Sequence, residues 1–423
     1  MQDKEFFTAL FQAAVEAADP ERTIAGHLPP KPKGRTIVIG AGKGSAQMAS
    51  AFENAWARKY GDASLEGLVV TRYGFGAPCK HIEIIEASHP VPDAAGLVAS
   101  KRLLKTVSGL TKDDLVVALI SGGGSALLPS PPEGMTLDDE ITVNKVLLSS
   151  GAPIAAMNAV RKHLSTIKGG RLAAAAHPAR VYSLIVSDIP GDNPAFVASG
   201  PTVTDETTRE DALKLVERYS LDLPAAALAH LHSEKADAPK PSDAVFADHE
   251  YRVIASAGVS LEAAAKAARN LGVEAVILSD AIEGEAREVA HVHAAMAKHV
   301  LAKDQPFKKP VVILSGGETT VTVRGKGKGG RNSEFLLSLA IDIDGADGIS
   351  AFAADTDGID GSEDNAGAFA DSTSIARLLA KGHDASASLN SNDAWTAFDA
   401  IDDLFVPGPT GTNVNDLRAI LIR

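Results

Sequence analysis

Short, continuously apolar segments alternate with alanine-rich stretches along most of the chain. The first group of segments is "RTIVIGAG", "LEGLVVTRYG", "HIEIIEASHP", "DLVVALISGGG" and "RVYSLIVSDIPGD". A second group follows residue 245: "YRVIASAG", "EAVILSD", "KPVVILSGGET", "GISAFAADTDG" and "LRAILIR". Because polar residues do not alternate with apolar ones, these segments are typical of strands buried on both faces. Helical stretches such as "LEAAAKAARNLG" separate several of them, so we expect an α/β fold with mostly parallel sheets covered by helices.

The length of 423 residues exceeds what one hydrophobic core usually supports, so two domains are expected. The stretch "HSEKADAPKPSDAV" at 232–245 combines prolines, charges and small residues and is the best linker candidate. We therefore predict domains at 1–240 and 241–423. A single TIM barrel is the weaker alternative, because its repeat spacing is more regular and it gives the linker no role.

Composition narrows the class of function. A net charge of −13 argues against a nucleic-acid surface, which needs a basic face. The single cysteine, Cys79, excludes an intrachain disulfide framework and a cysteine-rich metal site. The N-terminal sequence lacks signal-peptide features, and no apolar run approaches transmembrane length. We expect a cytoplasmic protein that acts on a small molecule, without a nucleic-acid or membrane partner.

The stretch "TIVIGAGKGSAQMA" at 36–49 predicts a strand, a glycine turn and a helix. It fails the dinucleotide fingerprint, because Ser45 replaces the third glycine and the next strand ends in "VVTRYG" without an acid. It fails the P-loop pattern because Ile37 stands where a glycine is required. What remains is Lys43 beside N–H groups that open a helix, which favours an anion site. A surface lysine in a tight turn is the alternative. The flanking candidates are Gly42, Gly44 and Ser45.

A second turn, "LISGGGSALLPSP" at 119–131, offers small residues and backbone donors. A serine nucleophile elbow needs G-x-S-x-G, and Leu127 breaks that pattern after Ser125. We favour an anion cradle over a nucleophile. Its candidates are Ser121, Gly122, Gly123, Gly124 and Ser125.

The stretch "IAAMNAVRKHLSTIKGGRLA" at 154–173 has apolar residues at helical spacing. The opposite face would gather basic and polar residues that suit a phosphate or a carboxylate. A solvated helix surface is the alternative. The members of this face are Asn158, Arg161, Lys162, Ser165 and Lys168.

Two aspartates follow the next apolar segment, in "LIVSDIPGDNPAFVASGPT" at 184–202. Asp188 stands where the strand should end, a position suited to a general base or a Mg²⁺ partner. Asp192 follows a Pro-Gly turn, and ordinary turn chemistry explains it equally well.

The stretch "TVRGKGKGGRNSEFLLSLA" at 322–340 crowds basic residues into a glycine-rich loop before a helix. Such a loop can close on a polyanion as a moving lid, with Arg331 neutralising phosphoryl charge. A flexible surface loop is the alternative. Farther on, "AADTDGIDGSEDNAGAFAD" fails the EF-hand register at Ile359 and Asp360. Asp355 and Asp357 could still face a nucleotide-bound metal, or form a surface turn.

Taken together, these motifs resemble the glycerate 2-kinase family, whose C-terminal part is called the MOFRL domain. The matching stretches are "IGAGKGSAQMA", "SGGGSALLP", "MNAVRKHLSTIKGGRLA", "SDIPGDNPAFVASGPT", "LSGGETTVTVRGKGKGGRNSEF", "DTDGIDG" and "GTNVNDL". The resemblance implies phosphorylation of D-glycerate at its 2-hydroxyl by ATP, giving 2-phospho-D-glycerate. It also implies two α/β domains, the first Rossmann-like, with the active site in the cleft between them.

The resemblance gives Lys43 and Arg331 roles in activity and makes Asp188 a candidate base. Some family members carry a hydroxypyruvate reductase label, which the failed dinucleotide fingerprint disfavours. An NAD(P)H-dependent reductase and a non-catalytic sugar-acid-binding protein remain the alternatives. A homodimer is one possible assembly, which the sequence does not decide.

The resulting hypothesis assigns four groups of residues, with ATP and Mg²⁺ as cofactors. The catalytic group is Lys43, Asp188 and Arg331. Glycerate or phosphate would be bound by Gly42, Gly44, Ser45, Ser121, Gly122, Gly123, Gly124, Ser125, Asn158, Arg161, Lys162 and Lys168. The nucleotide would be bound by Gly316, Gly317, Lys326, Lys328, Gly330 and Asn332. Metal partners would be Asp192, Glu318, Asp355 and Asp357.

Overall fold

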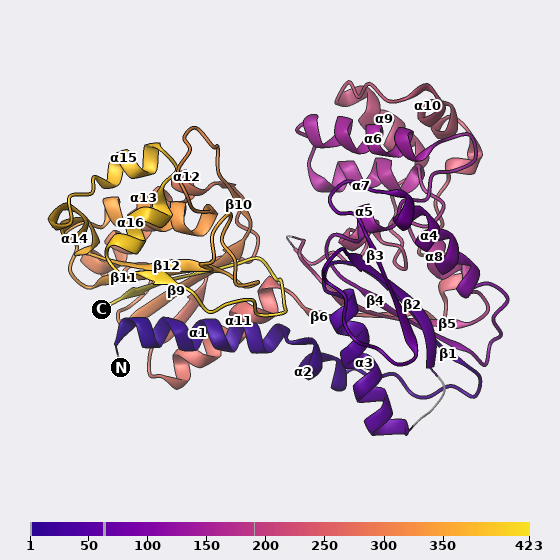
Figure 1. Ribbon diagram of the computed structural model, residues 1–423, viewed down its shortest axis with the longest axis horizontal. Coiled ribbons are helices and arrows are strands. Elements are labelled where there is room, and N and C mark those ends of the chain that lie inside the picture. The colour runs from indigo at the N-terminus through magenta and orange to yellow at the C-terminus, as the bar shows by residue number, and fades with distance from the viewer. Residues whose placement is uncertain (1, 62–64, 190) are drawn as a thin grey trace. The chain divides into compact units, whose positions relative to one another are not determined.

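The computed structural model describes residues 2–61, 65–189 and 191–423, which form two compact units (Figure 1). The central unit is one continuous segment, Pro20–Ile254. The terminal unit combines Met1–Asp19 with Ala255–Arg423. Each unit has its own six-stranded sheet and its own buried core, so each is described by itself.

The sheet of the central unit has the strand order β3-β2-β1-β4-β5-β6. The pairs β1–β2, β2–β3, β1–β4 and β4–β5 are all parallel. This order is that of a Rossmann fold, with the direction of chain progression reversing between β1 and β4. The expectation of a parallel, Rossmann-like sheet is confirmed. The strands are β1 (Thr36–Ala41), β2 (Leu65–Arg72), β3 (Ile82–Ala87), β4 (Leu115–Ile120), β5 (Arg180–Val186) and β6 (Glu250–Ala255).

The continuous apolar character of these strands is explained by burial on both faces. Every residue of β1 and β4 is buried, and Ile37, Val116 and Val181 belong to the main core of the unit. A group of helices at one end has a separate small core that includes Val143 and Val160 (Figure 1). The helices of the unit are α2 (Pro20–Ala25), α3 (Ser45–Tyr60), α4 (Ala94–Thr106), α5 (Gly124–Leu127), α6 (Leu137–Ser149), α7 (Ile154–His163), α8 (Arg171–Ala175), η1 (Val197–Ser199), α9 (Arg209–Arg218), α10 (Ala225–Leu231), η2 (Glu234–Ala236) and η3 (Ala244–Phe246).

The single helix expected over 154–173 is wrong. Helix α7 ends at His163, and α8 begins only at Arg171. Between them Gly169 and Gly170 have φ values of +62° and +81°, in the left-handed region that favours glycine. The polar residues after His163 therefore do not extend the face of α7.

The sheet of the terminal unit has the order β13-β12-β11-β14-β9-β7. Only β7–β9 is parallel among the pairs of this sheet in the described residues; β9–β14, β14–β11, β11–β12 and β12–β13 are antiparallel. The α/β class is confirmed, but the mostly parallel sheet expected here is wrong. The strands are β7 (Glu274–Ile277), β9 (Val311–Gly317), β11 (Ile349–Asp355), β12 (Gly367–Asp371), β13 (Leu404–Phe405) and β14 (Asp416–Ile422), with a small parallel pair, β8 (Gly284–Glu285) and β10 (Thr319–Thr320).

Antiparallel pairs arise at two places in the chain. The loop from β11 to β12 contains no helix that could carry the chain back, so β12 returns beside β11 in the opposite direction. The last strand, β14, then inserts between β9 and β11. The strand β12, "GAFAD", is rich in small residues and did not stand out as an apolar segment.

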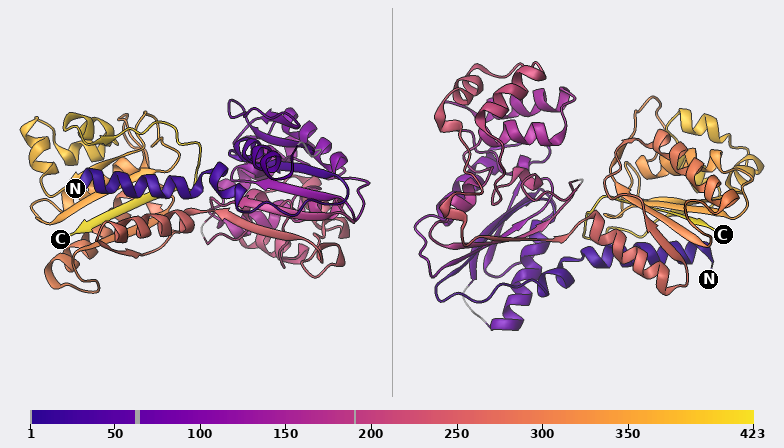
Figure 2. Two further views of the ribbon diagram at one scale, coloured as in Figure 1. Left: turned by 90° about the horizontal axis from the view of Figure 1, so that it is seen from below. Right: turned by 180° about the vertical axis from the view of Figure 1, so that it is seen from behind.

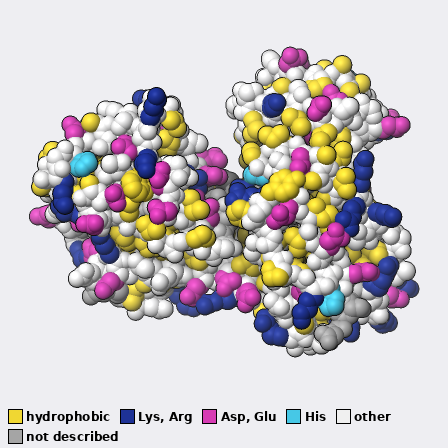
Figure 3. Space-filling view, viewed as in Figure 1, with side chains coloured by type: hydrophobic (Ala, Val, Ile, Leu, Met, Phe, Trp, Pro, Cys, Tyr) yellow, Lys and Arg dark blue, Asp and Glu magenta, His cyan; other side chains and the backbone are white. Residues whose placement is uncertain are grey.

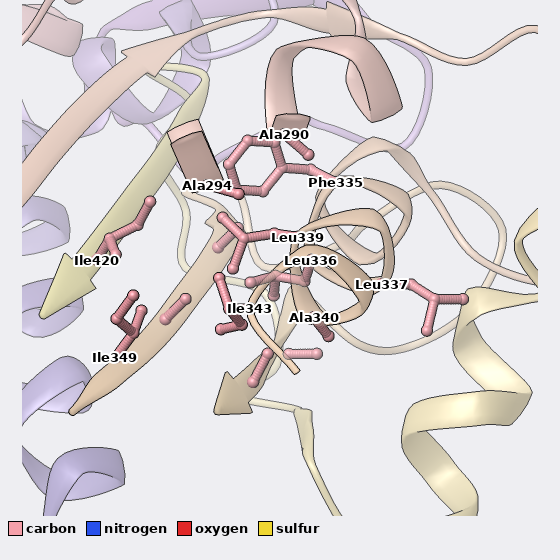
Figure 4. Close-up of a cluster of buried hydrophobic side chains, with 14 of the residues drawn as sticks. Ala290, Ala294, Phe335, Leu336, Leu337, Leu339, Ala340, Ile343, Ile349 and Ile420 are labelled. Carbon is pink, nitrogen blue, oxygen red and sulfur yellow. The ribbon is translucent and has the colours of Figure 1, made fainter. Parts of the chain in front are cut away.

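Helices cover both faces of this sheet. One face packs on α12 and α13 through residues that include Ala290, Phe335 and Ile420 (Figure 4). The other face packs on α1 and α11, where the ring of Phe7 stacks on that of Phe352 with centroids 5.9 Å apart (Figures 1 and 2). The helices are α1 (Asp3–Ala18), α11 (Ala257–Asn270), α12 (Ala286–Lys303), α13 (Arg331–Asp342), α14 (Ser374–Ala380), α15 (Ala385–Asn390) and α16 (Ala394–Ala400).

The division into units differs from the domains expected at 1–240 and 241–423. Strand β6 follows the expected linker but joins the central sheet beside β5, so the central unit continues to Ile254. Helix α1 belongs to the terminal unit, because the apolar face that carries Phe7 and Leu10 packs in its core. An amphipathic pattern shows which face of a helix is buried, but not against which sheet.

No helix within the described ranges is long and apolar enough to cross a bilayer. Charged side chains of both signs are spread over the visible face of each unit (Figure 3).

Candidate functional site

Two glycine-rich turns meet at the carboxyl ends of β1 and β4. The N–H of Lys43 donates to the carbonyl oxygen of Gly122 at 2.8 Å, and the N–H of Gly44 donates to Ser121 Oγ at 3.0 Å. Ser121 Oγ also lies 3.1 Å from Ser45 Oγ. In a sheet of this order, the crevice beyond these two strand ends is the usual ligand site. The two turns predicted separately from the sequence therefore lie against each other.

Two glycines of the second turn leave room for charged side chains. A Cβ atom placed on Gly122 would lie 1.8 Å from Asp188 Oδ2, and one placed on Gly123 would lie 2.9 Å from Lys43 Cγ. The carboxylate of Asp188 and the stem of Lys43 thus lie against adjacent backbone positions. Gly123 also has φ +80°, a conformation that other residues rarely adopt. The structure brings a cation and a carboxylate, both predicted from sequence, to the same turn.

A chain of side-chain hydrogen bonds joins the turn to helix α7. Ser125 Oγ lies 2.7 Å from Ser199 Oγ, which donates to Asn158 Oδ1 at 2.9 Å. Arg161 reaches the same Asn158 oxygen at 3.5 Å. The predicted residues Ser125, Asn158 and Arg161 are therefore connected. The sequence did not reveal Ser199, because its role depends on contacts with residues far away in the chain.

The backbone around Ser199 is unusual. Ala198 and Ser199 have φ values of +53° and +60°, where residues other than glycine are strained. Such strain persists only where the surrounding structure holds it, and Ser199 is held by hydrogen bonds on both sides of its hydroxyl. The strained turn places this hydroxyl between Ser125 and Asn158.

Two predicted substrate-binding lysines do not join this cluster. Lys162 and Lys168 are each 2% exposed. Lys162 forms an ion pair with Asp205, and Lys168 Nζ donates to Glu140 Oε1 at 2.7 Å. Buried ion pairs of this kind position helices rather than bind solutes from solvent. The expected basic face therefore does not include Lys162 or Lys168, and Ser165 lies beyond the end of α7.

In the terminal unit, Arg331 begins helix α13 and faces three carboxylates. Its Nε donates to Asp416 Oδ1 at 2.8 Å, a terminal nitrogen donates to Asp355 Oδ2 at 2.5 Å, and the other lies 3.5 Å from Glu318 Oε1. Burial alone would lower the pKa of Arg331, but Asp416, Asp355 and Glu318 raise it above its usual value. Burial also raises the pKa of Asp355 well above its ordinary range, although the charge of Arg331 opposes this.

Asp360 completes the network and was not predicted. It is 1% exposed and accepts from the N–H groups of Asn332 and Ser333 at 2.9 and 2.8 Å. These N–H groups are in the first turn of α13, where a carboxylate is favoured. The amide nitrogen of Asn332 donates to Asp416 Oδ1 at 2.8 Å, so this predicted nucleotide-loop residue is turned into the network.

Hydrogen bonds connect the glycine-rich loop before Arg331 to the segment after α15, and its movement as a lid stays a prediction. Asn392 Oδ1 accepts from the N–H groups of Arg324 and Gly325 at 2.7 and 3.0 Å. Asp393 accepts from the N–H of Lys328 at 2.9 Å. A Cβ atom on Gly325 would lie 2.1 Å from the carbonyl oxygen of Ser391. Gly325 therefore allows a close approach of two backbone segments.

A cavity of about 300 Å³ lies beside this loop. Among the predicted residues, Gly330 and Arg331 line it. Lys328 Nζ lies 4.9 Å from the centroid of the Trp395 ring, and Lys326 is exposed. Gly316 and Gly317 end β9 and are not part of the lining. The lining residues are Thr319, Val321, Val323, Gly327, Gly329, Gly330, Arg331, Glu334, Gly361, Asn392 and Ala394.

Comparisons with known proteins show the family of the chain. The family model described as a domain of unknown function, DUF4147, matches residues 6–232, and the MOFRL family model matches residues 311–416. The D-glycerate 2-kinase of Thermotoga maritima is 38% identical over 420 residues, which are 99% of this chain and 98% of that protein. The chain belongs to the glycerate 2-kinase family.

A solved member of the glycerate 2-kinase family has the same fold. The crystal structure of glycerate kinase from Thermotoga maritima has a TM-score of 0.90 and 38% identity, with 99% of each chain covered. A protein of Agrobacterium vitis with a provisional hydroxypyruvate reductase name is 52% identical over 421 residues, 99% of this chain and 94% of its own. The resemblance inferred from the sequence motifs is confirmed at the level of the family.

The predicted metal partners of this family member lie in different surroundings. Asp192 belongs to the central unit, where its N–H donates to Ile189 at 3.1 Å. Asp355 uses one oxygen for the N–H of Asp357 and the other for Arg331. Within the described part of the chain, no group of three or more His, Cys, Asp or Glu could hold a metal ion. One or two separate carboxylates suit a Mg²⁺ that is held mainly by nucleotide phosphates. The half-exposed Glu318 and Asp357 fit that role best.

Proposed function

We propose that the protein transfers the γ-phosphoryl group of ATP to the 2-hydroxyl of D-glycerate, giving 2-phospho-D-glycerate and ADP. The observation that carries the proposal is the placement of Lys43 and Asp188 against Gly123 and Gly122, at the point where the strand order reverses. A small sugar acid needs a cation for its carboxylate and a base for its hydroxyl, and this turn offers both. The kinase names of full-length relatives support the same reaction.

In the central unit, Asp188 accepts the proton of the 2-hydroxyl as its oxygen attacks the γ-phosphorus. The bond between that phosphorus and the bridging oxygen of ADP breaks at the same time. Lys43 offsets negative charge on the substrate carboxylate or the transferred group. Asn158 and Arg161, joined to Ser125 through Ser199, provide further polar contacts for glycerate.

In the terminal unit, we propose that ATP binds at the cavity beside the glycine-rich loop. Arg331 lines this cavity and its side chain is 25% exposed, so part of its guanidinium can face a phosphate. The nitrogen that pairs with Glu318 makes the longest of the three contacts, at 3.5 Å, and its partner is the most exposed of the three carboxylates, so this is the end of Arg331 that we assign to a phosphate. Mg²⁺ bound by the phosphates would neutralise charge, with Glu318 and Asp357 as its protein partners. An arginine that stabilises the transferred group contributes roughly a thousandfold or more.

The expectation that both units contribute to one active site in an interdomain cleft stays a prediction. The cytoplasmic location and a homodimeric assembly also stay predictions.

The test is a coupled assay with D-glycerate, ATP, Mg²⁺, enolase, pyruvate kinase and lactate dehydrogenase, without phosphoglycerate mutase. Enolase accepts only the 2-phosphate, so NADH loss that requires both D-glycerate and enolase supports a 2-kinase. ADP formation without NADH loss would point to the 3-hydroxyl or to another product.

The reductase interpretation is tested separately. The strand β2 ends in Thr71 and Arg72, so the acid that a dinucleotide site needs for the ribose is missing there. We therefore expect no NADH oxidation with hydroxypyruvate in a mixture without lactate dehydrogenase. NADH oxidation in that mixture, without ADP formation from glycerate, would replace the kinase proposal. Glycerate binding without either activity would indicate a binding protein.

A further inference from the structure

A histidine outside the predicted set lies at the turn that holds Lys43. His89 follows β3 by two residues, in the sequence "SHPVPD". A Cβ atom placed on Gly123 would lie 3.1 Å from His89 Nε2 and 2.9 Å from Lys43 Cγ. The imidazole and the lysine stem therefore lie together over one glycine. Asp188 lies over the adjacent position, Gly122.

The loop that carries His89 is anchored at both ends. Before it, the N–H of Tyr73 donates to the carbonyl oxygen of Ala87 at 3.1 Å. After it, the Tyr73 hydroxyl donates to Asp93 Oδ2 at 2.8 Å, and the N–H of Gly96 donates to Asp93 Oδ1 at 3.0 Å. One tyrosine thus ties together both sides of the loop. A side chain held in this way reaches the site without a large loss of freedom on binding.

The surroundings of His89 determine which kind of group it can bind. Burial, followed by the charges of Lys43 and Arg72, lowers the pKa of His89 to about 4. The ring is therefore neutral near pH 7, with one nitrogen as donor and the other as acceptor. A neutral imidazole suits a hydroxyl group, which can also donate and accept. The adjacent Lys43 suits a negative group.

We propose that His89 binds the second hydroxyl of the sugar-acid substrate, the one on C3 of glycerate, and is a specificity-determining residue. Asp188, assigned to the 2-hydroxyl, lies over Gly122, and the imidazole lies over the adjacent Gly123, so it is placed to reach a hydroxyl on the neighbouring carbon. The identity of the substrate rests on the proposed function. The role of His89 as a hydroxyl-binding group rests on its place beside Lys43 and Gly123.

The experiment compares D-glycerate with D-lactate, which lacks the 3-hydroxyl. For the wild type, His89→Ala and His89→Gln, two quantities are measured: kcat/KM from ADP release, and the rise in melting temperature with increasing ligand. We expect His89→Ala to lower kcat/KM for D-glycerate by about ten- to a hundredfold. D-lactate should be affected by less than about threefold, because it makes no contact that the variant can lose. His89→Gln keeps a neutral donor and acceptor and should recover part of the preference.

The control is His81→Ala, whose side chain is 52% exposed and lies in the same unit. It should match the wild type in both measurements. Unchanged preference for D-glycerate in His89→Ala would overturn the inference. An equal loss for both ligands, not recovered by His89→Gln, would show a structural role and also overturn it.

Failure of the proposed function gives a different result. If the wild type releases no ADP with D-glycerate, the kinase proposal fails, while the melting measurement still compares ligand binding. Stabilisation by D-glycerate that is lost in His89→Ala and kept in His81→Ala would support the inference without turnover. Equal stabilisation of His89→Ala and His81→Ala by D-glycerate, or no stabilisation of the wild type, would overturn the inference.

Discussion

The Nε atom of Arg331 donates to a carboxylate oxygen of Asp416 at 2.8 Å, and the side chain of Asp416 has 0% exposure. The side chain of Arg331 is itself 25% exposed and lines the cavity beside the glycine-rich loop. One guanidinium therefore neutralises a buried carboxylate and presents part of its charge to a cavity. A substitution at this position tests stability and activity together, and the two effects must be separated.

Removal of Arg331 should destabilise the protein as well as inactivate it. Arg331→Ala removes the ion pair of the buried Asp355, while Asp416 keeps its pair with Arg418, so the change should cost about 3 kcal/mol of unfolding free energy. Arg331→Lys keeps the positive charge but loses the planar set of N–H donors of the guanidinium. This variant should therefore remain folded, with turnover reduced at least about tenfold. Melting temperature and kcat distinguish the two effects.

Arg324→Ala serves as the control, because Arg324 is exposed in the same loop. It should melt as the wild type does. An Arg331→Ala protein of wild-type melting temperature would show that the buried carboxylates do not depend on this arginine.

Substitution of Lys43 should affect turnover without affecting the fold. The side chain of Lys43 is half-buried at the turn after β1, with its stem against Gly123, so its removal takes no group out of the hydrophobic core. We expect Lys43→Ala to reduce kcat by about a hundredfold or more, and to change the melting temperature by less than about 2 °C. Lys33→Ala, at an exposed position of the same unit, should keep full activity. Near-normal turnover of Lys43→Ala would remove Lys43 from the catalytic group.

The close approach of Asp188 to Gly122 can be tested by adding one methyl group. In Gly122→Ala the new Cβ would lie 1.8 Å from Asp188 Oδ2, so the carboxylate has to move. A displacement of about 1 Å at a reacting group can cost about a hundredfold in rate. Gly26→Ala is the matched control, since its nearest atom would be 3.8 Å away. Both variants should fold, and only Gly122→Ala should lose kcat. Full activity of Gly122→Ala would mean that the position of Asp188 does not matter for the reaction.

The glycine-rich loop should become mobile when Asn392 is removed. Asn392→Ala deletes the acceptor for the N–H groups of Arg324 and Gly325 and the donor to Glu334. Each such loss weakens local order by about 1 kcal/mol or more, so hydrogen exchange at these amides should accelerate about tenfold or more.

Asn392→Ala should also raise the KM for ATP more than the KM for D-glycerate, if the cavity beside the loop holds the nucleotide. Asn390→Ala, at an exposed position two residues earlier, should change neither exchange nor KM. Faster exchange with an unchanged KM for ATP would separate the order of the loop from nucleotide binding.

The proximity of Lys43, Gly122 and Asp188 in the candidate site could be predicted because these residues follow strand ends directly. The apolar segments predicted the strands. A glycine or a charged residue soon after each segment marked Lys43, Gly122 and Asp188 as candidates. Parallel strands bring their carboxyl ends to one edge, so sequence order was sufficient to bring these residues together. His89 also follows a strand, β3, but a histidine beside a proline gave no pattern with a known chemistry.

What could not be predicted depends on partners far away in the chain. Lys162 looked like part of a basic surface, but Asp205 pairs with it, and Glu140 does the same for Lys168. The place of α1 in the terminal unit depends on which sheet its apolar face finds. Antiparallel pairing of β14 between two earlier strands also leaves no local signal.

The buried His163 should make stability depend on pH. It is 0% exposed, and its ring bonds the carbonyl oxygen of Ala159 at 2.6 Å. Burial first, and then the charges of Lys162, Arg171 and Lys240, lower its pKa from 6.5 to about 4, although the bond to Ala159 opposes this. Between these two values the unfolded chain binds more protons than the folded one. The unfolding free energy that the neutral His163 ring contributes is therefore complete above pH 6.5, and it is lost as the pH falls toward 4.

The measurement is the unfolding free energy of the wild type and His163→Leu at pH 7.5 and pH 5.5. Leucine cannot take up a proton, so the wild type should lose about 1 kcal/mol more than this variant between the two pH values. Other buried histidines, such as His293, add a slope that both proteins share. Equal slopes for the wild type and His163→Leu would show that His163 takes up its proton in the folded state as readily as in the unfolded chain.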